Sequence, residues 1–200
     1  MKWTIDKSFD FCYGHRVHNQ RLDTNFTENN DGCLACRHLH GHQGKIKVFL
    51  ESSILKSGMV TDFKHLGWFK QFIDDTLDHK FIMDLSDPLC PHELPDLCVN
   101  DTGSVIQEVN KSLLMPAKDV LTNTIFWTPD MSKLNLNNQA VYEKYEGLVL
   151  VDFVPTSENI CSWLLGIANN RMKELDVVVT ALEFWETPKS HCRVDWTHEV

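Results

Sequence analysis

Histidines and cysteines gather in the N-terminal part of this 200-residue chain. Five of its ten histidines and three of its seven cysteines lie between Cys12 and His42. Within that stretch His40, Gly41 and His42 form a His-x-His pair. Residues two apart on an extended strand point to the same face, so both imidazoles can reach one cation at about 2.0 to 2.1 Å. The spacing therefore indicates metal chemistry, with His15 as third ligand if the two strands that carry these residues pair.

Cys33 and Cys36 offer a second way to hold a metal. Their Cys-x-x-Cys spacing, joined to His40 and His42, is typical of a closed structural zinc site that stabilises a fold without catalysis. Three histidines would instead leave a coordination position for water or substrate, as catalytic zinc sites do. The spacing alone does not rank these arrangements, and the two histidines could also be plain surface residues of a polar loop.

Two other places in the sequence could carry proton transfer or ligand binding. Asp78 followed by His79 could orient a proton-transferring imidazole, although such a pair is more often solvated at a helix end. Glu186, where a strand runs into a turn, could accept a pair of N–H donors from a flat heterocycle, and its alternative is a solvated turn acid. Neither place establishes a function by itself.

The elements that position these residues follow from the apolar pattern. Alternating apolar residues predict strands, and apolar residues at three- and four-residue steps predict helices. Asp62 is a possible N-cap of the first helix, and Thr156 and Ser157 supply cap hydroxyls for the second. The pattern predicts strands over 3–12 and 45–50 and then a helix over 62–78. An inserted excursion over 86–145 follows. After it come a strand over 148–154, a helix over 155–172 and strands over 176–185 and 190–196.

The excursion at about 86–145 differs in composition from the rest of the chain. It holds five of the seven prolines, and Asn29 to Gly32 marks a separate turn before it. Val105, Ile106, Val109 and Leu113 have the spacing of a short amphipathic helix within it. A length of 200 residues suits one domain, so we expect a single domain over 1–200 with an inserted segment at about 86–145.

Composition and charge restrict the partners and the compartment. A formal net charge of −9 and a pI near 5.5 argue against a nucleic-acid partner. The longest apolar run, Gly147–Val154, is interrupted by Asp152, so no membrane span is expected. The charged N-terminus does not resemble a signal peptide, and an odd number of cysteines without framework spacing suits thiols or metal ligands. We therefore expect a cytoplasmic protein.

Six short motifs together resemble the 6-pyruvoyl-tetrahydropterin synthase superfamily. They occur in the order typical of that family and cover both ends of the chain: FCYGHR (11–16), CRHLHGH (36–42), GMVTDF (58–63), LDH (77–79), PTSEN (155–159) and WET (185–187). The resemblance implies an α+β T-fold, an antiparallel sheet with two helices on one face. It also implies that subunits join into barrels as a homo-oligomer, a trimer or hexamer.

The resemblance assigns a role to each candidate residue. It implies zinc as the cofactor, bound by His15, His40 and His42, with Cys36 as the thiol base. It also implies that Asp78 and His79 transfer protons. The substrate would be bound by Glu186, which anchors the pterin ring, and by Thr156 and Glu158 at the start of the second helix.

The spacing of Cys36 from His40-Gly41-His42 separates branches of the family. Three residues separate Cys36 from His40, and this spacing is similar to that of the branch that forms 6-carboxy-5,6,7,8-tetrahydropterin. That branch starts from 7,8-dihydroneopterin triphosphate in queuosine and other 7-deazaguanine synthesis. The pyruvoyl-forming branch of biopterin synthesis is the nearest alternative, and a non-catalytic zinc module built with Cys33 and Cys36 is the other. A folate-linked branch carries Glu at the catalytic position, so Cys36 argues against it.

Overall fold

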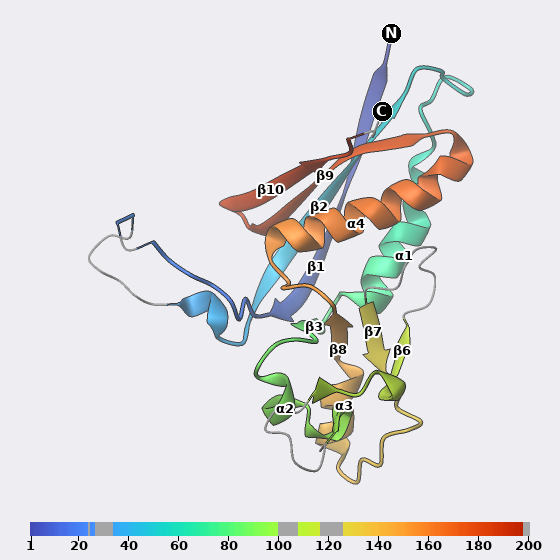
Figure 1. The fold of residues 1–200 in the computed structure, drawn as a ribbon. Helices are drawn as coiled ribbons and strands as arrows, with labels where there is room; N and C mark the ends of the chain where they lie inside the picture. The colour runs from blue at the N-terminus through green and yellow to red at the C-terminus, as the bar shows by residue number, and fades with distance from the viewer. Residues whose placement is uncertain (24, 27–33, 100–107, 117–125, 198–200) are drawn as a thin grey trace.

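One mixed sheet organises the chain. The computed structural model describes residues 1–23, 25–26, 34–99, 108–116 and 126–197. In these ranges eight strands hydrogen-bond in the order β10-β9-β2-β1-β3-β8-β7-β6, and β4 pairs with β5 apart from them (Figure 1). Their bounds are β1 Trp3–His15, β2 His40–Ser52, β3 Lys80–Asp84, β4 Cys98–Val99, β5 Glu108–Val109, β6 Leu114–Pro116, β7 Phe126–Pro129, β8 Leu148–Val151, β9 Val178–Thr187 and β10 Ser190–Asp195.

Two helices cover one face of the long strands. α1 (Gly67–Thr76) and α4 (Ser157–Met172) lie on the same side of β1, β2 and β9 (Figure 1), while the shorter α2 (Cys90–Glu93) and α3 (Gln139–Glu146) belong to the inserted segment. The predicted α+β class, a largely antiparallel sheet with two helices on one face, is confirmed.

The helices begin where the sequence supplies side-chain caps. The Asp62 carboxylate accepts the backbone N–H of Lys64, and a 3-10 turn over Phe63–Leu66 leads into α1. The Thr156 hydroxyl accepts the N–H of Asn159 at the start of α4. Each cap satisfies a backbone donor that the first turn leaves without a partner.

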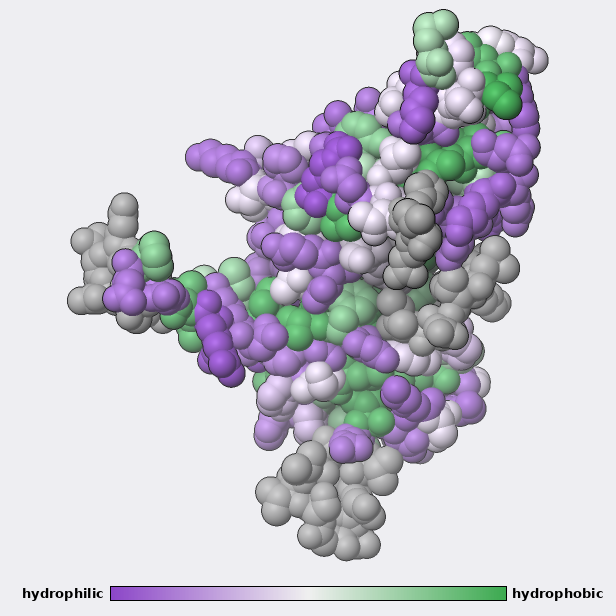
Figure 2. Space-filling view, turned by 45° about the horizontal axis from the view of Figure 1, so that its top comes forward, coloured by the Kyte–Doolittle hydropathy of each residue, from purple (hydrophilic) through white to green (hydrophobic). Residues whose placement is uncertain are grey.

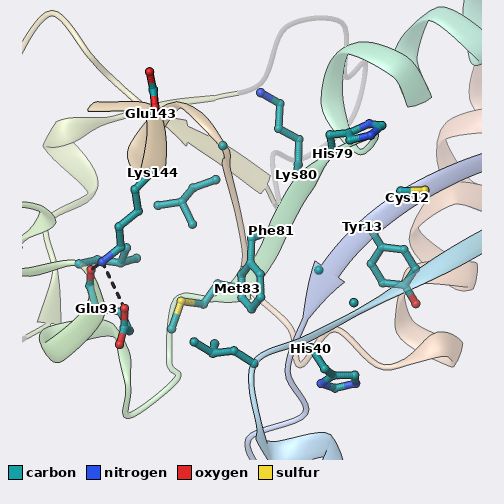
Figure 3. A pocket seen from close by; sticks show the side chains of 16 residues that line it. Cys12, Tyr13, His40, His79, Lys80, Phe81, Met83, Glu93, Glu143 and Lys144 are labelled. Atoms are coloured by element: carbon teal, nitrogen blue, oxygen red, sulfur yellow. Dashed lines mark hydrogen bonds and ion pairs between the residues drawn. The ribbon is translucent and has the colours of Figure 1, made fainter. Parts of the chain in front are cut away.

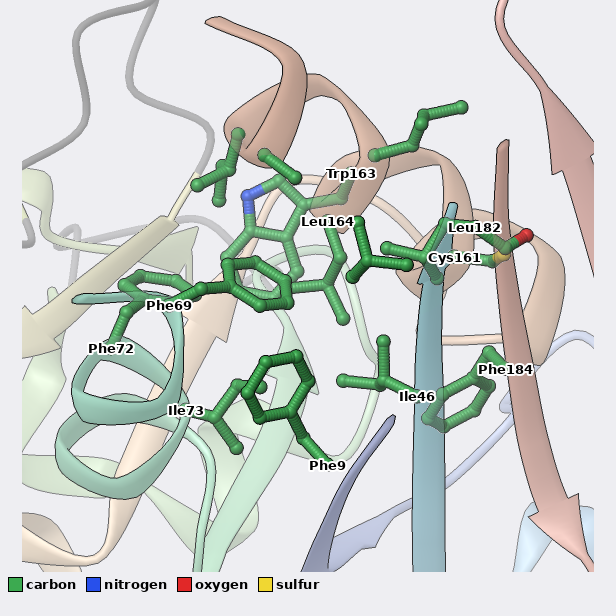
Figure 4. Packing of buried hydrophobic residues seen from close by; sticks show 14 of the residues in the cluster. Phe9, Ile46, Phe69, Phe72, Ile73, Cys161, Trp163, Leu164, Leu182 and Phe184 are labelled. Carbon is green, nitrogen blue, oxygen red and sulfur yellow. The ribbon is translucent and has the colours of Figure 1, made fainter. Parts of the chain in front are cut away.

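The main core lies between these helices and the sheet. Apolar side chains from the inner face of β1, β2 and β9 pack against α1 and α4 (Figure 4): Phe9, Ile46, Leu182 and Phe184 from the sheet and Phe69, Ile73, Cys161 and Leu164 from the helices. Because strand side chains alternate between faces, burying this face fixes which residues of β1 point inward. The same parity places Tyr13 and His15 on the buried side.

Part of the sheet is parallel, which the sequence pattern did not indicate. β3 pairs in parallel with β1 and with β8, whereas β1, β2, β9 and β10 are antiparallel neighbours. Parallel neighbours need a crossover connection rather than a tight turn. Here α1 lies on the connection that leads to β3, and the inserted segment with α3 lies between β3 and β8.

The inserted segment extends the sheet and has its own apolar cluster. β6 and β7 add to the edge beside β8. A second group of buried residues packs around Tyr145 and Leu94, separate from the main core. The predicted helix through Val109 and Leu113 is wrong: Val109 lies in β5, and the Asn110 side chain caps a 3-10 turn that contains Leu113. Val105, Ile106 and the Asn29–Gly32 turn lie outside the described residues.

Several predicted bounds shift by a few residues. β1 and β2 run beyond the predicted 3–12 and 45–50 and include all three candidate metal ligands, while β8 ends at Val151 rather than at residue 154. The described part of the segment between β1 and β2 extends from the body (Figure 1), and the face in Figure 2 mixes hydrophilic and hydrophobic groups. In the described ranges, no helix combines the length and apolar character needed to cross a membrane.

Candidate active site

Three histidines converge at the end of the β1–β2 hairpin where the connecting segment 16–39 leaves β1 and enters β2. In the antiparallel register His15 lies opposite His40, and Tyr13 lies opposite His42. One ligand atom from each of His15, His40 and His42 lies within 4.8 Å of the others. Their ring centroids are 4.6 to 5.2 Å apart. Two of the ligands come from one strand and the third from its partner, as the His-x-His interpretation expects.

Backbone carbonyls orient two of these imidazoles. The Nδ1 atom of His15 lies 2.7 Å from the carbonyl oxygen of Pro155, and that of His40 lies 2.7 Å from the carbonyl oxygen of His38. A carbonyl can only accept, so Nδ1 carries a proton in both rings and Nε2 is the nitrogen that faces the other histidines as a possible metal ligand. Such outer contacts fix the tautomer of metal-binding histidines.

The buried nitrogens of the cluster fit a metal ion. His15 is fully buried, and the Nε2 atoms of His15 and His42 have no hydrogen-bond partner among the described residues. An unpaired polar atom at such a position is costly unless a ligand satisfies it. Burial lowers the pKa of His42, which keeps the ring neutral and able to bind metal. Three imidazoles that converge in this way are a suitable donor set for zinc.

Close backbone approach requires glycine between the two ligands of β2. A Cβ atom on Gly41 would lie 2.9 Å from the carbonyl oxygen of Tyr13 on β1. Any side chain there would push the strands apart and displace His40 and His42 from His15. The central residue of the His-x-His pair is thus constrained by packing.

Glu186 is the fourth polar group at the cluster. Its Oε1 atom lies 3.3 Å from Nε2 of His15 and 3.6 Å from Nε2 of His42, and its side chain is 25% exposed. These are long electrostatic contacts, since both nitrogens remain without an aligned hydrogen bond. The contact with His15 lowers the pKa of Glu186, so the carboxylate stays charged. The group predicted as a ring anchor therefore lies where it could also bind the metal.

Tyr13 is a site residue that sequence reasoning missed. Its ring centroid lies 5.1 Å from that of His15 and 5.8 Å from that of His42. Its hydroxyl is buried without a hydrogen-bond partner among the described residues, and burial followed by the charge of Glu186 raises its pKa. The alternation of Phe11, Tyr13 and His15 would have identified it, because all three point to one face.

Cys36 lies outside the cluster of three histidines. It occupies a short 3-10 turn, Ala35–Arg37, and is partly buried. Within the described ranges the group of ligand atoms that could hold a metal consists of the three histidines and omits this thiol. This favours the open site over the closed one. Cys33 lies outside the described residues.

The Asp78–His79 pair forms a separate group. Nδ1 of His79 lies 2.9 Å from Oδ2 of Asp78, while Oδ1 of Asp78 accepts the backbone N–H of Cys12 at 2.7 Å. The bond from Cys12 is the largest influence that lowers the pKa of Asp78. His79 has a positive φ of 58° and a side chain that is 80% exposed. Figure 3 shows its ring apart from that of His40.

The residues at the start of α4 adjoin the cluster through the backbone. Pro155 contacts His15, and Thr156 follows as the helix cap, with its hydroxyl directed to Asn159. Glu158 lies exposed in the first turn. This segment lies beside the three histidines, and in the described ranges neither Thr156 nor Glu158 makes a hydrogen bond or ion pair with them.

A cavity of about 680 Å³ opens beside the hairpin end (Figure 3). One wall comes from the ends of β1 and β2 and includes His40. The opposite wall comes from β3 and the inserted segment and includes Phe81, Glu93 and Lys144. Lys144 pairs with Glu93 at 3.2 Å. The volume falls in the range of small-molecule sites, so the inserted segment shapes space next to the histidines.

Comparison with known proteins settles the family. A family model described as 6-pyruvoyl tetrahydropterin synthase matches residues 4–196. The chain belongs to this family. Its relatives include the 6-carboxy-5,6,7,8-tetrahydropterin synthase of Aquifex aeolicus, 28% identical over 201 residues that cover 95% of this chain and 96% of the relative. The protein of the same name from Haemophilus influenzae is 26% identical over 194 residues, covering 94% and 95%.

Two solved structures share the fold of this chain. An uncharacterized protein from Wolinella succinogenes superposes with a TM-score of 0.85 at 47% identity and covers 98% of both chains. The 6-pyruvoyl tetrahydropterin synthase of Caenorhabditis elegans gives a TM-score of 0.51 at 19% identity, with 98% of this chain and 97% of that chain covered. The T-fold assignment is confirmed, and the family is one of pterin synthases.

Proposed function

We propose that this family member is a zinc-dependent 6-carboxy-5,6,7,8-tetrahydropterin synthase. It would convert 7,8-dihydroneopterin triphosphate to the 6-carboxypterin with release of acetaldehyde and triphosphate, in queuosine or other 7-deazaguanine synthesis. The observation that carries the proposal is the convergence of the buried His15 with the half-buried His40 and His42, in which backbone carbonyls orient the rings of His15 and His40. The names of the relatives from Aquifex aeolicus and Haemophilus influenzae support the carboxy-forming branch.

Each protein group has a distinct task in this proposal. A zinc ion held by the three histidines would act as a Lewis acid toward the hydroxyls of the substrate side chain. The Cys36 thiolate would remove a proton from a side-chain carbon, and His79, oriented by Asp78, would move protons during the later steps. The start of α4, with Thr156 and Glu158, would line the substrate site.

Product analysis tests the proposal directly. The purified protein is incubated with 7,8-dihydroneopterin triphosphate, and the products are identified by mass spectrometry beside a zinc determination. A carboxypterin together with acetaldehyde supports the proposal. A pyruvoyl-pterin would assign the biopterin-type activity on the same fold, and zinc without any turnover would favour the non-catalytic module.

Glu186→Gln should mainly weaken substrate binding. We propose that the carboxylate accepts two N–H groups of the pterin ring, and a charged hydrogen bond contributes about 1.5 to 3 kcal/mol. The Michaelis constant should rise about 10- to 100-fold, with kcat less affected, as steady-state kinetics would measure.

Two further measurements decide between roles for Glu186. Glu183→Gln is the matched control, because Glu183 lies on the same strand but outside the cluster. Its carboxylate pairs with Arg193 at a distance of 3.1 Å. An unchanged Michaelis constant in Glu186→Gln would exclude the ring anchor. Loss of zinc from this variant would instead assign Glu186 as a metal ligand.

We propose that the Asp78–His79 pair serves the site of a neighbouring subunit in a trimer or hexamer. The exposure of the His79 side chain supports this arrangement, and within one chain the same residue lines the cavity that also reaches His40. If so, Cys36→Ala and His79→Ala subunits, each nearly inactive, should regain about a quarter of wild-type activity when co-assembled. Each variant reassembled with itself is the control, and the absence of any recovery would place the pair within its own chain's site.

The remaining expectations concern organisation and location. We propose that residues 1–200 form one T-fold domain with an insertion at about 86–145, and the continuous sheet that includes β6 and β7 supports this. We further propose a cytoplasmic enzyme whose subunits join into barrels and which acts on a free small molecule, without nucleic-acid or membrane partners. The net charge of −9 is consistent with that choice of partner.

A further inference from the structure

Two buried carboxylates lie where β3 leads into the inserted segment. Asp84 is 3% exposed and Asp87 is 2% exposed. One oxygen of each accepts a nearby backbone N–H, from Ser86 at 2.9 Å and from Leu89 at 2.8 Å respectively. These local bonds orient both carboxylates, so that each presents its second oxygen in a fixed direction.

The second oxygens meet the segment that follows β1. Oδ2 of Asp84 lies 2.9 Å from Nε2 of His18, and Oδ2 of Asp87 lies 2.9 Å from Nε of Arg16. The contact of Arg16 is an ion pair without the alignment of a hydrogen bond. The guanidinium of Arg16 compensates the buried charge of Asp87, and the ring of His18 bonds Asp84, so residues 16–18 are held against the start of the insertion.

The same segment holds the turn that carries Cys36. The backbone N–H of Val17 donates to the carbonyl of Cys36 at 2.7 Å, and the N–H of Cys36 donates to the side-chain oxygen of Gln20 at 3.0 Å. Arg37 donates from Nε and Nη2 to the carbonyl of Gln20 at 3.0 and 2.7 Å. Both backbone groups of Cys36 are therefore bonded to residues 17–20.

We propose that Asp84 and Asp87 are positioning residues that act through Arg16 and His18 to place Cys36 for catalysis. The inference rests on the proposed function of Cys36 as the base. A base must lie within hydrogen-bond reach of the proton it removes, and a misplacement of about 1 Å can reduce the rate about 100-fold. The start of the insertion would thus help to position the catalytic thiol in addition to its role in the fold.

Asp87→Asn in the full-length protein tests the connection. Hydrogen exchange followed by mass spectrometry should become faster in the peptides that contain residues 16–20 and 35–37, since their mutual bonds lose their anchor. With 7,8-dihydroneopterin triphosphate, kcat should fall about 10- to 100-fold. The Michaelis constant and zinc content should stay within about twofold, because the variant leaves substrate and metal ligands in place.

Matched variants distinguish positioning from general destabilisation. Asp130→Asn removes another buried acid of the insertion, which bonds Ser132 and Lys133, and should alter neither exchange at Cys36 nor kcat. Asp87→Glu, which keeps the charge, should recover part of the activity. If Asp87→Asn does not fold, Gln20→Ala provides the test, because it removes only the side chain that accepts from Cys36 and should lower kcat in the same way.

The outcomes separate this inference from the proposed function. Unchanged exchange at residues 35–37, or faster exchange with unchanged kcat, overturns the positioning role. If hydrogen exchange becomes faster in the variant but the wild-type protein forms no pterin product, the proposed activity is contradicted. The contacts of Asp84 and Asp87 are then purely structural. A fall in kcat that is matched by equal zinc loss also overturns the inference, since the defect would lie in the metal site.

Discussion

Replacement of His40 by alanine should remove the bound metal and lower turnover at least about a thousandfold. Metal Lewis acids contribute several kcal/mol to catalysis, and each 1.36 kcal/mol corresponds to about tenfold in rate. Two imidazoles would remain, fewer than the three protein ligands of catalytic zinc sites. Elemental analysis and steady-state kinetics on the same preparation measure both effects.

The geometry of the hairpin holds His40 in a fixed position at the cluster. Its ring is held by the carbonyl of His38, and Gly41 beside it cannot carry a side chain without contacting Tyr13. His65→Ala is the matched control, because His65 bonds Thr61 on the turn before α1 and lies outside the cluster. Full zinc occupancy in His40→Ala, or activity near that of His65→Ala, would show that the cluster is not the metal site.

Replacement of Cys36 by alanine should leave zinc bound and reduce kcat about 100- to 10,000-fold. This range is the usual contribution of one general acid or base. The thiol lies outside the group of metal-ligating atoms, so its loss should not weaken the coordination of the metal. Zinc content and single-turnover kinetics separate the two properties.

Cys12→Ala is the appropriate control for Cys36. Cys12 is an exposed thiol on β1 that contributes backbone groups to Asp78 and His79, so alanine keeps those contacts. If Cys36→Ala loses both zinc and activity, the closed structural zinc site with Cys33 and Cys36 is supported. In that case the open three-histidine site, and with it the proposed reaction, would be incorrect.

Local sequence patterns determined much of the fold because they act within a few residues. Alternation fixed the inner faces of the long strands, and the side chains of Asp62 and Thr156 fixed the helix starts. The short spacing of His40 and His42 was sufficient to place both on one face. The resemblance of six short motifs identified the family, which the comparison over residues 4–196 confirmed.

The wrong helix through Val109 and Leu113 has a local cause, because the Asn110 side chain between them caps a turn two residues away. Other features depended on contacts distant in sequence. The parallel pairing of β3 depends on which strands become neighbours, a choice made by packing of the whole sheet. Local periodicity is the same for parallel and antiparallel neighbours of a buried strand, so the sequence pattern could not distinguish them.

The sequence by itself determined the donor types of the site and the face on which each one lies. Tertiary structure alone decided the register that sets His15 opposite His40 and the approach of Glu186 to the cluster. It also decided the separation of His79 from that cluster. Side-chain direction follows from backbone geometry at each residue, whereas these distances arise from pairing and packing between segments that lie tens of residues apart.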